Sequence, residues 1–258
     1  YVPMGSQFEL KGSGSLTIEC YAPAGIGIGN DFDHSYGDIA VDMEGRLEII
    51  SNSVDTLCIG GGYNEDDSEI NLRSGQIRIH MHSHNGLAIG SFNGDALIDI
   101  SDKCKLELTV SGIKVTGIGS CKGIATISSS ADIAISCTGA QAVAIGSLED
   151  GEGSIYIKSG KLMMKMRSAK NSAIGAIKGN MNTRVENADI SIDSEGDEIT
   201  GIGDALGTGN VAIIDSAVTM KILAANPKDI GTGSGDLKIV NSTVSSLINN
   251  KVITHSNI

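Results

Sequence analysis

The sequence predicts an all-β protein that folds as a single-stranded parallel β-helix (β-solenoid) of about eight coils. An isoleucine followed directly by glycine returns eight times, at intervals of 27 to 31 residues. Between these pairs, apolar and polar residues alternate as in strands, and no helical period appears. A repeat of this length over many copies is typical of stacked units that share one continuous core. The marker isoleucines are Ile28, Ile59, Ile89, Ile118, Ile145, Ile174, Ile202 and Ile230.

The repeats divide a single predicted domain, residues 1–258, into three parts. Residues 1–27 precede the first marker, and Phe8, Leu10, Leu16 and Ile18 alternate there with polar residues. This pattern predicts an N-terminal capping coil. Residues 28–248 hold the repeats. Residues 249–258 lose the alternation, so we expect a C-terminal cap or a tail.

Each repeat is expected to contain three short strands. In the fifth repeat, Ile155 and Ile157 form the first strand, and the turn 158–161 leads into a second strand from Leu162 to Met166. A third short strand runs into the next marker, Ile174. Ser, Asn, Asp and Gly fill the turns because they tolerate tight or left-handed backbone. Right-handed crossovers are the rule for parallel strands, so we expect a right-handed coil. At about 4.8 Å per layer, eight coils give a rod about 38 Å long.

The glycine of each marker pair is predicted to stand at a sharp corner, where a side chain would collide with the next coil. Three or four residues after each of the first seven marker isoleucines, a second series of mostly large residues follows. We expect this corner series to form a buried stack under the loops, and the alternative is a platform for an aromatic ligand. Its members are Phe32, Tyr63, Phe92, Cys121, Leu148, Ile177 and Leu206.

Composition argues against some functions. The formal net charge of −12 and the isoelectric point near 4.7 would repel a phosphate backbone, so nucleic acid is not an expected partner. The longest apolar runs are far below the roughly 18 residues of a membrane span. The start at Tyr1 shows no signal-peptide pattern and suggests a piece of a larger protein.

The five cysteines are predicted to be small buried side chains. They are odd in number and show no CxxC spacing, which argues against a disulfide framework and against a structural zinc site. They are Cys20, Cys58, Cys104, Cys121 and Cys137.

No catalytic residues are predicted. Sugar-cleaving enzymes need acids gathered on one face, and the outward positions of the first two strands do not place two acids side by side. Glu48, Arg78 and Glu107 alternate in sign, which indicates a surface ion ladder. Nucleophile motifs and phosphate-binding loops are absent. The first-strand positions are Ala40, Asn71, Asp99, Thr126, Tyr156, Arg184, Ala212 and Lys238; the second-strand positions are Glu48, Arg78, Glu107, Ala134, Met163, Ser191, Thr219 and Ser245.

Three histidines form one candidate metal site. His80, His82 and His84 alternate along one strand, so their imidazoles share a face with about 6.8 Å between successive side chains. Two of them could bind zinc or another transition metal if a neighbour supplied a third ligand. The alternative is a polar outer face without a metal.

The acidic loops after the first two markers form a candidate binding region. Asp31, Asp33 and Ser35 alternate like the first ligands of a calcium loop, but Gly37 comes one place late and no bidentate glutamate follows. Calcium binding is therefore one possibility, and a solvated acidic rim is the other. The candidate residues are Asp31, Asp33, Tyr36, Asp38, Glu65, Asp66 and Asp67.

The segments Leu87-Ala88-Ile89-Gly90 and Ser154 to Lys161 carry a resemblance to a known family. They resemble repeats of large bacterial surface proteins, especially from anaerobic gut and cellulolytic bacteria, whose coils read Ala-Ile-Gly-Gly followed by Ile-x-Ile-x-Gly-Gly. The resemblance covers residues 24 to 244, although Ser, Ala or Asp replaces the second glycine in several coils. It implies an extracellular, non-catalytic spacer or adhesion module, sometimes described as carbohydrate-binding.

We therefore expect a module at the cell surface or outside the cell that spaces or displays other domains and binds a glycan or a protein partner. The 3% aromatic content argues against strong stacking on sugars. The alternative function is a polysaccharide-cleaving β-helix enzyme, a lyase or a hydrolase.

Overall fold

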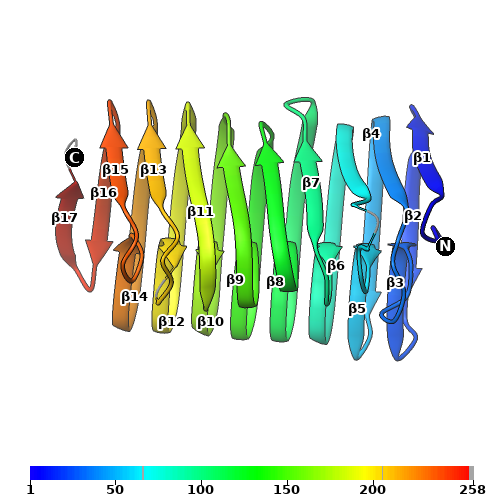
Figure 1. The fold of residues 1–258 in the computed structure, drawn as a ribbon, viewed down its shortest axis with the longest axis horizontal. Helices are drawn as coiled ribbons and strands as arrows, with labels where there is room; N and C mark the ends of the chain where they lie inside the picture. The colour runs from blue at the N-terminus through cyan, green and yellow to red at the C-terminus, as the bar shows by residue number, and fades with distance from the viewer. Residues whose placement is uncertain (66, 205, 256–258) are drawn as a thin grey trace.

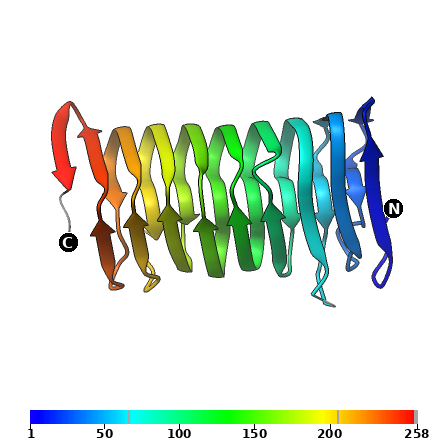
Figure 2. The ribbon, with the colours of Figure 1, turned by 90° about the horizontal axis from the view of Figure 1, so that it is seen from above.

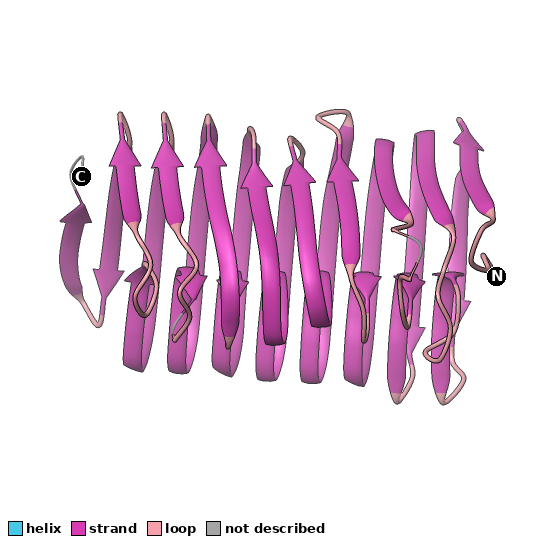
Figure 3. Ribbon diagram, viewed as in Figure 1, coloured by secondary structure: helices cyan, strands magenta, loops and turns pink. Residues whose placement is uncertain are grey.

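The computed structural model describes residues 1–65, 67–204 and 206–255, which coil repeatedly around one axis into a rod (Figure 1). The first coil and the last strand lie at opposite ends, and Figure 2 shows the same order of coils from another direction. All seventeen strands belong to one sheet, and the described residues contain no helix (Figure 3). None of the described segments is therefore a helix of the length and hydropathy that crossing a membrane requires.

The strands, in chain order, are β1 (Gln7–Gly12), β2 (Ser15–Cys20), β3 (Ala24–Gly29), β4 (Asp38–Asn52), β5 (Asp55–Gly61), β6 (Glu69–Ser91), β7 (Ala96–Ile100), β8 (Cys104–Ser129), β9 (Asp132–Ile157), β10 (Gly160–Ala176), β11 (Gly179–Glu186), β12 (Ala188–Asp204), β13 (Val211–Ile214), β14 (Ala217–Ile230), β15 (Leu237–Val240), β16 (Thr243–Ile248) and β17 (Lys251–His255).

The coils stack in parallel register and give about nine turns. The second strand of each turn pairs in the order β2, β4, β6, β8, β9, β10, β12, β14 and β16. The solenoid predicted from the sequence is confirmed, and the N-terminal segment contributes a full turn through β1, β2 and β3. Several predicted short strands merge into long ones such as β6, because stacked corners continue the parallel ladder through the bend.

The marker isoleucines form one internal column. Each lies directly beside its counterpart on the next coil, from Ile28 through Ile145 to Ile230. The six isoleucines between the first and the last are completely buried, at 0% exposure. The predicted continuous core is confirmed, and the two ends of the column are slightly more accessible because each has a coil on one side only.

The marker glycines from Gly29 to Gly203 stand at corners where a side chain would collide with the next coil. All eight marker glycines have positive φ, between 110° and 143°. A Cβ atom built on Gly146 would lie 1.9 Å from the carbonyl oxygen of Gly175 on the next coil, and the same collision recurs from Gly29 to Gly203. The glycine is therefore required both by its backbone conformation and by the close approach of the coils.

Turns between the first and second strands follow the predicted chemistry. Asn187, Asp215 and Asn241 have φ of 48°, 48° and 47°, which is the left-handed region that Asn and Asp tolerate best. Gly75 and Gly160 take positive φ at turns in other coils. The chain therefore turns from the first to the second strand at a residue type that tolerates positive φ.

The register confirms the second outward column from Glu48 to Ser245, and Arg78 bridges to Glu107 at 2.7 Å. The first outward column needs one correction: Ser128, rather than Thr126, lies between Asp99 and Tyr156. The buried Ser129 stands in register between Ile100 and Ile157, so a polar residue fills an inward position that isoleucine fills on both neighbouring coils.

All five cysteines are free. Four are buried, as predicted, whereas Cys20 is only half-buried. Burial raises the pKa of each thiol, so these side chains remain protonated and behave as small apolar groups.

The C-terminal strand β17 differs from the other strands because it runs antiparallel to β16. The His255 ring nitrogen Nε2 lies 2.6 Å from the Asp229 carboxylate, and both side chains are largely buried. Burial raises the pKa of Asp229, but its hydrogen bonds, of which that with His255 has the largest effect, outweigh burial and leave the pKa below the usual range. This contact holds β17 against the last coil through β14.

Replacing Thr183 by valine is expected to stabilise the protein by about 1 kcal/mol. Thr183 stacks between Ile155 and Val211 in the core, is 2% exposed, and its hydroxyl has no hydrogen-bond partner. Valine has nearly the same shape and removes the buried polar atom. Urea unfolding would measure the gain in the free energy of unfolding.

Thr56→Val is the matched control. The buried Thr56 hydroxyl contacts the Ser51 hydroxyl at 3.0 Å, so removing it should destabilise the protein. Equal losses in both variants would contradict this account.

Candidate functional site

A groove runs along the rod beside the third strands. Its larger part has a volume of about 990 Å³ and its smaller part about 220 Å³, and both parts are lined by Leu148 and Glu149. We call this continuous hollow the axial groove. One wall consists of polar residues at the start of the third strands, and the other consists of residues in the loops after the glycine corners.

The polar wall takes one side chain from each of six successive coils. These residues pair in register along the sheet, so they form a straight column parallel to the axis. Lys114 Nζ lies 2.5 Å from Glu149, and Lys170 Nζ lies 2.9 Å from Glu198. The wall therefore offers hydrogen-bond donors and acceptors at intervals of about 4.8 Å. Its members are Asn85, Lys114, Gln141, Lys170, Glu198 and Asn226.

The opposite wall is formed by later members of the corner series, namely Phe92, Cys121, Leu148, Ile177 and Leu206. The prediction of a fully buried stack is wrong, because Leu206 is 80% exposed and Tyr63 is 37% exposed. The loops after the corners differ in shape between coils, so their apolar side chains do not all turn inward. Burial is nearly complete only for Leu148 and Cys121.

At the N-terminal end of the series, the aromatic residues pack on one another. The rings of Phe32 and Phe92 meet edge to face with centroids 5.1 Å apart. They cover Leu57 and Leu87, which form a small apolar cluster outside the main core with Cys121. The larger part of the axial groove has an aliphatic wall instead.

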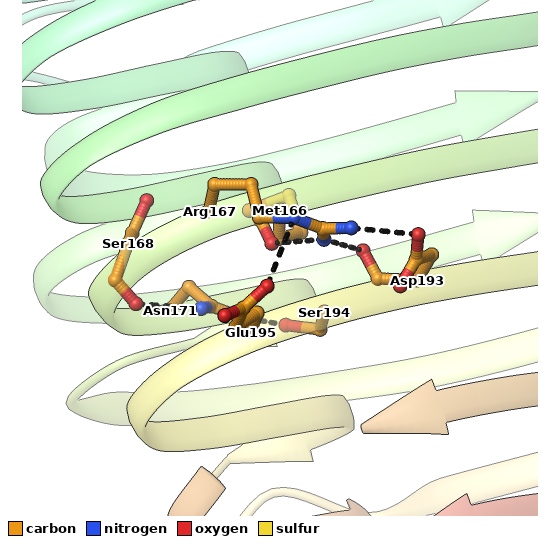
Figure 4. Close-up of polar contacts among 7 residues, drawn as sticks. All are labelled: Met166, Arg167, Ser168, Asn171, Asp193, Ser194 and Glu195. Carbon is orange, nitrogen blue, oxygen red and sulfur yellow. Dashed lines mark hydrogen bonds and ion pairs between the residues drawn. The ribbon is translucent and has the colours of Figure 1, made fainter. Parts of the chain in front are cut away.

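A polar network fixes the corner that leads into Lys170 (Figure 4). Arg167 on β10 donates to the Asp193 carboxylate at 2.7 Å and to two backbone carbonyls, and it contacts Glu195 at 3.4 Å. On the inner side of the corner, the Asn171 amide donates to the Ser168 carbonyl at 3.0 Å and accepts from the Ser194 hydroxyl at 2.7 Å. These contacts join two neighbouring coils directly before Lys170 and Glu198 of the polar wall.

Asp204 stabilises one of the loops that form the apolar wall of the axial groove. Its carboxylate is fully buried and accepts the backbone N–H groups of Ala176 at 2.8 Å and Met181 at 2.6 Å. These two residues flank the loop that carries Ile177. Burial raises the pKa of Asp204 to about 6, against the opposing effect of the two N–H donors and of the Lys228 charge. The acid therefore ties one corner loop to the following coil.

The acidic loop residues predicted from the sequence do not gather at one point. Asp31 contacts the His34 ring, and this hydrogen bond lowers the pKa of Asp31 and raises that of His34. Asp33 is exposed in the same loop. Tyr36 is completely buried, and burial raises its pKa. Its hydroxyl accepts a 3.4 Å hydrogen bond from the amide of Asn64.

The remaining acidic candidates divide between two places. Asp38 and Asp67 line a hollow of about 490 Å³ on the first-strand face, where Asp38 accepts the Glu69 N–H at 3.1 Å. Glu65 is exposed and donates its backbone N–H to Ser35. Asp66 lies outside the described residues. Calcium binding by these loops stays a prediction.

The histidines lie where the alternation placed them. His80, His82 and His84 are exposed on one face of β6, while Met81 and Ser83 between them are buried. His82 Nδ1 lies 2.9 Å from the Ser111 hydroxyl, and His80 lies 4.0 Å from Glu48. Within residues 1–65, 67–204 and 206–255, no three histidine, cysteine or acidic side chains converge as a metal site requires.

The sequence also contains a signal for the axial groove, which patterns typical of catalytic and metal sites do not reveal. Each member of the polar wall stands four residues before a marker isoleucine, and Lys122, Glu149 and Lys178 stand four residues after one.

Comparison of the chain with protein-family models, with curated proteins and with solved structures finds no match, so the groove itself is the basis for a functional conclusion.

Proposed function

We propose that this chain is a non-catalytic spacer and adhesion module of an extracellular surface protein, and that it binds a glycan or a protein partner in the axial groove. The observation that carries the proposal is the groove itself. It follows the axis across six coils, with a column of polar side chains facing an apolar wall. Such a surface suits an elongated ligand, which gains contacts at every coil.

The rigid rod supports the spacer role. A continuous column of buried isoleucines holds successive coils at a fixed separation, and a solenoid of this kind gives extended binding surfaces. The resemblance to bacterial surface repeats supports the same role and the extracellular location.

A screen on a glycan array, combined with affinity capture of surface proteins, tests the proposal. We expect a ligand whose binding is lost in Leu206→Ser, which removes the exposed apolar side chain of the groove, and kept in Met163→Ser, which removes one from the second-strand face. A reducing-sugar assay runs in parallel on the bound glycans. Release of sugar by the isolated chain would overturn the non-catalytic role in favour of the polysaccharide-cleaving enzyme.

Metal binding is tested separately. If His80, His82 and His84 bind zinc, or if the acidic loops bind calcium, millimolar metal should raise the melting temperature, because a ligand that binds only the folded state stabilises it. His82→Ala should abolish the zinc effect and leave any calcium effect intact. An unchanged melting temperature with either metal would contradict the corresponding site.

A further inference from the structure

The axial groove carries a charge opposite to that of the whole chain. Its described lining residues include five lysines, namely Lys114, Lys122, Lys170, Lys178 and Lys228, and two glutamates, Glu149 and Glu198. The chain as a whole has a formal net charge of −12. A positive strip on an acidic protein attracts an anionic ligand to that strip and repels it from the rest of the surface.

The lysines of the two walls recur on alternate coils. Lys114 and Lys122 flank the marker Ile118, and Lys170 and Lys178 flank the marker Ile174 two coils further on. On the coil between them, the corresponding positions hold Gln141 and Glu149. Two coils correspond to about 9.6 Å along the axis.

The exposed lysines can accept a further anionic partner. The Lys114 and Lys170 side chains are 44% and 45% exposed, although each already contacts a glutamate on the following coil. Exposed pairs of this kind contribute little to stability, so a ligand carboxylate can join them without a large loss. Glu149, on the coil between the lysine coils, disfavours a second carboxylate there and can accept hydrogen bonds from hydroxyl or amide groups.

The spacing selects between polymer classes. An extended peptide places side chains of one face about 6.8 Å apart, which falls out of step with the lysine coils. Two linked pyranose rings in an extended polysaccharide advance by close to the distance of two coils. Resting on the proposed function, we propose that the axial groove binds an unbranched acidic polysaccharide that carries a carboxylate on every second sugar.

Binding of defined oligosaccharides to the whole chain tests this proposal. The probes are hyaluronan oligosaccharides, which carry a carboxylate on alternate sugars, polygalacturonate oligosaccharides, which carry one on each sugar, and uncharged cello-oligosaccharides. Titration calorimetry should show the strongest binding for hyaluronan, with an affinity that falls as salt is added. Lys114→Gln and Lys170→Gln should each weaken that binding about tenfold, because each removes a charged hydrogen-bond donor.

Two further variants separate position from total charge. Lys221→Gln removes the same charge from an exposed position on β14 outside the groove, so it should leave hyaluronan binding unchanged. Gln141→Lys adds a positive charge to the coil between the lysine coils and should shift the preference toward polygalacturonate.

The outcomes distinguish the ligand class from the proposed function. Equal or stronger binding of polygalacturonate or cello-oligosaccharides by the unaltered chain would overturn the alternating spacing while leaving the groove as a binding site. The same holds if a protein partner proves to be the ligand that Leu206→Ser loses. If every ligand found by screening binds Leu206→Ser, Lys114→Gln and Lys170→Gln normally, the groove is not the site and both proposals fail.

Discussion

Replacing Gly146 by alanine is expected to destabilise the solenoid by more than about 4 kcal/mol. Two costs combine at this corner. With φ of 134°, the backbone lies where residues with side chains are strained, and the new Cβ would stand 1.9 Å from the Gly175 carbonyl oxygen. The carbonyl belongs to the next coil and cannot rotate away, so the coils must separate and the Ile145–Ile174 contact beside them must loosen. Urea unfolding followed by circular dichroism would measure the loss.

Gly231 provides the matched control within the same column. Its φ of 118° imposes a similar backbone strain, but no atom lies within 4 Å of the Cβ position because no further marker coil covers it. Gly231→Ala should therefore cost only the strain, about 1–3 kcal/mol. If the two substitutions destabilise equally, the close approach of the coils is not what requires glycine.

The stability of the chain should depend on pH through the buried carboxyl of Asp204. Its pKa is about 6 in the folded chain and 3.8 for an ordinary aspartate. Between about pH 4 and pH 6, the folded state therefore holds a proton that the unfolded chain has released, and this group's contribution falls as the pH rises. The total change is about 3 kcal/mol. Relative to the unaltered chain, Asp204→Asn should thus gain about that much in stability between pH 4 and pH 7.

Asp229→Asn is the control of opposite sign. The pKa of Asp229 lies below its ordinary value despite burial, because of its hydrogen bonds, of which that with His255 has the largest effect. Its contribution to stability is present above the ordinary pKa and is lost as the pH falls through the lower folded value. Asp229→Asn should be less stable than the unaltered chain at pH 7, and the deficit should shrink in strong acid. A stability difference for Asp204→Asn that is constant with pH would contradict the role of burial.

The fold could be predicted because the pattern repeats. A single isoleucine or glycine allows many structures, but eight copies at nearly equal spacing require neighbours with the same environment. The register bears this out for the isoleucine column and for the second outward column. The prediction failed locally at Thr126, because the inward position after Ile127 is filled by the buried Ser129 and the apolar alternation therefore does not mark the end of that strand.

The arrangement of the candidate site residues was harder to predict from the sequence than the fold. Alternation correctly placed the three histidines on one face, since the side-chain period of a strand is fixed. It could not show whether loop residues such as Asp31 and Asp38 converge, because loops have no period. Tyr36 was expected beside the acidic residues and is instead completely buried.

By itself, the sequence determined the stacking of the coils, the continuous core and the need for glycine at the corners, because each follows from contacts between identical positions on adjacent coils. Only the tertiary structure decided which exposed positions face one another across a hollow. The polar residues before each marker and the apolar residues after it are close in the chain, yet they become opposite walls only because the glycine corner turns the loop back beside the strand. That turn brings Lys114 to Glu149, and it creates the axial groove.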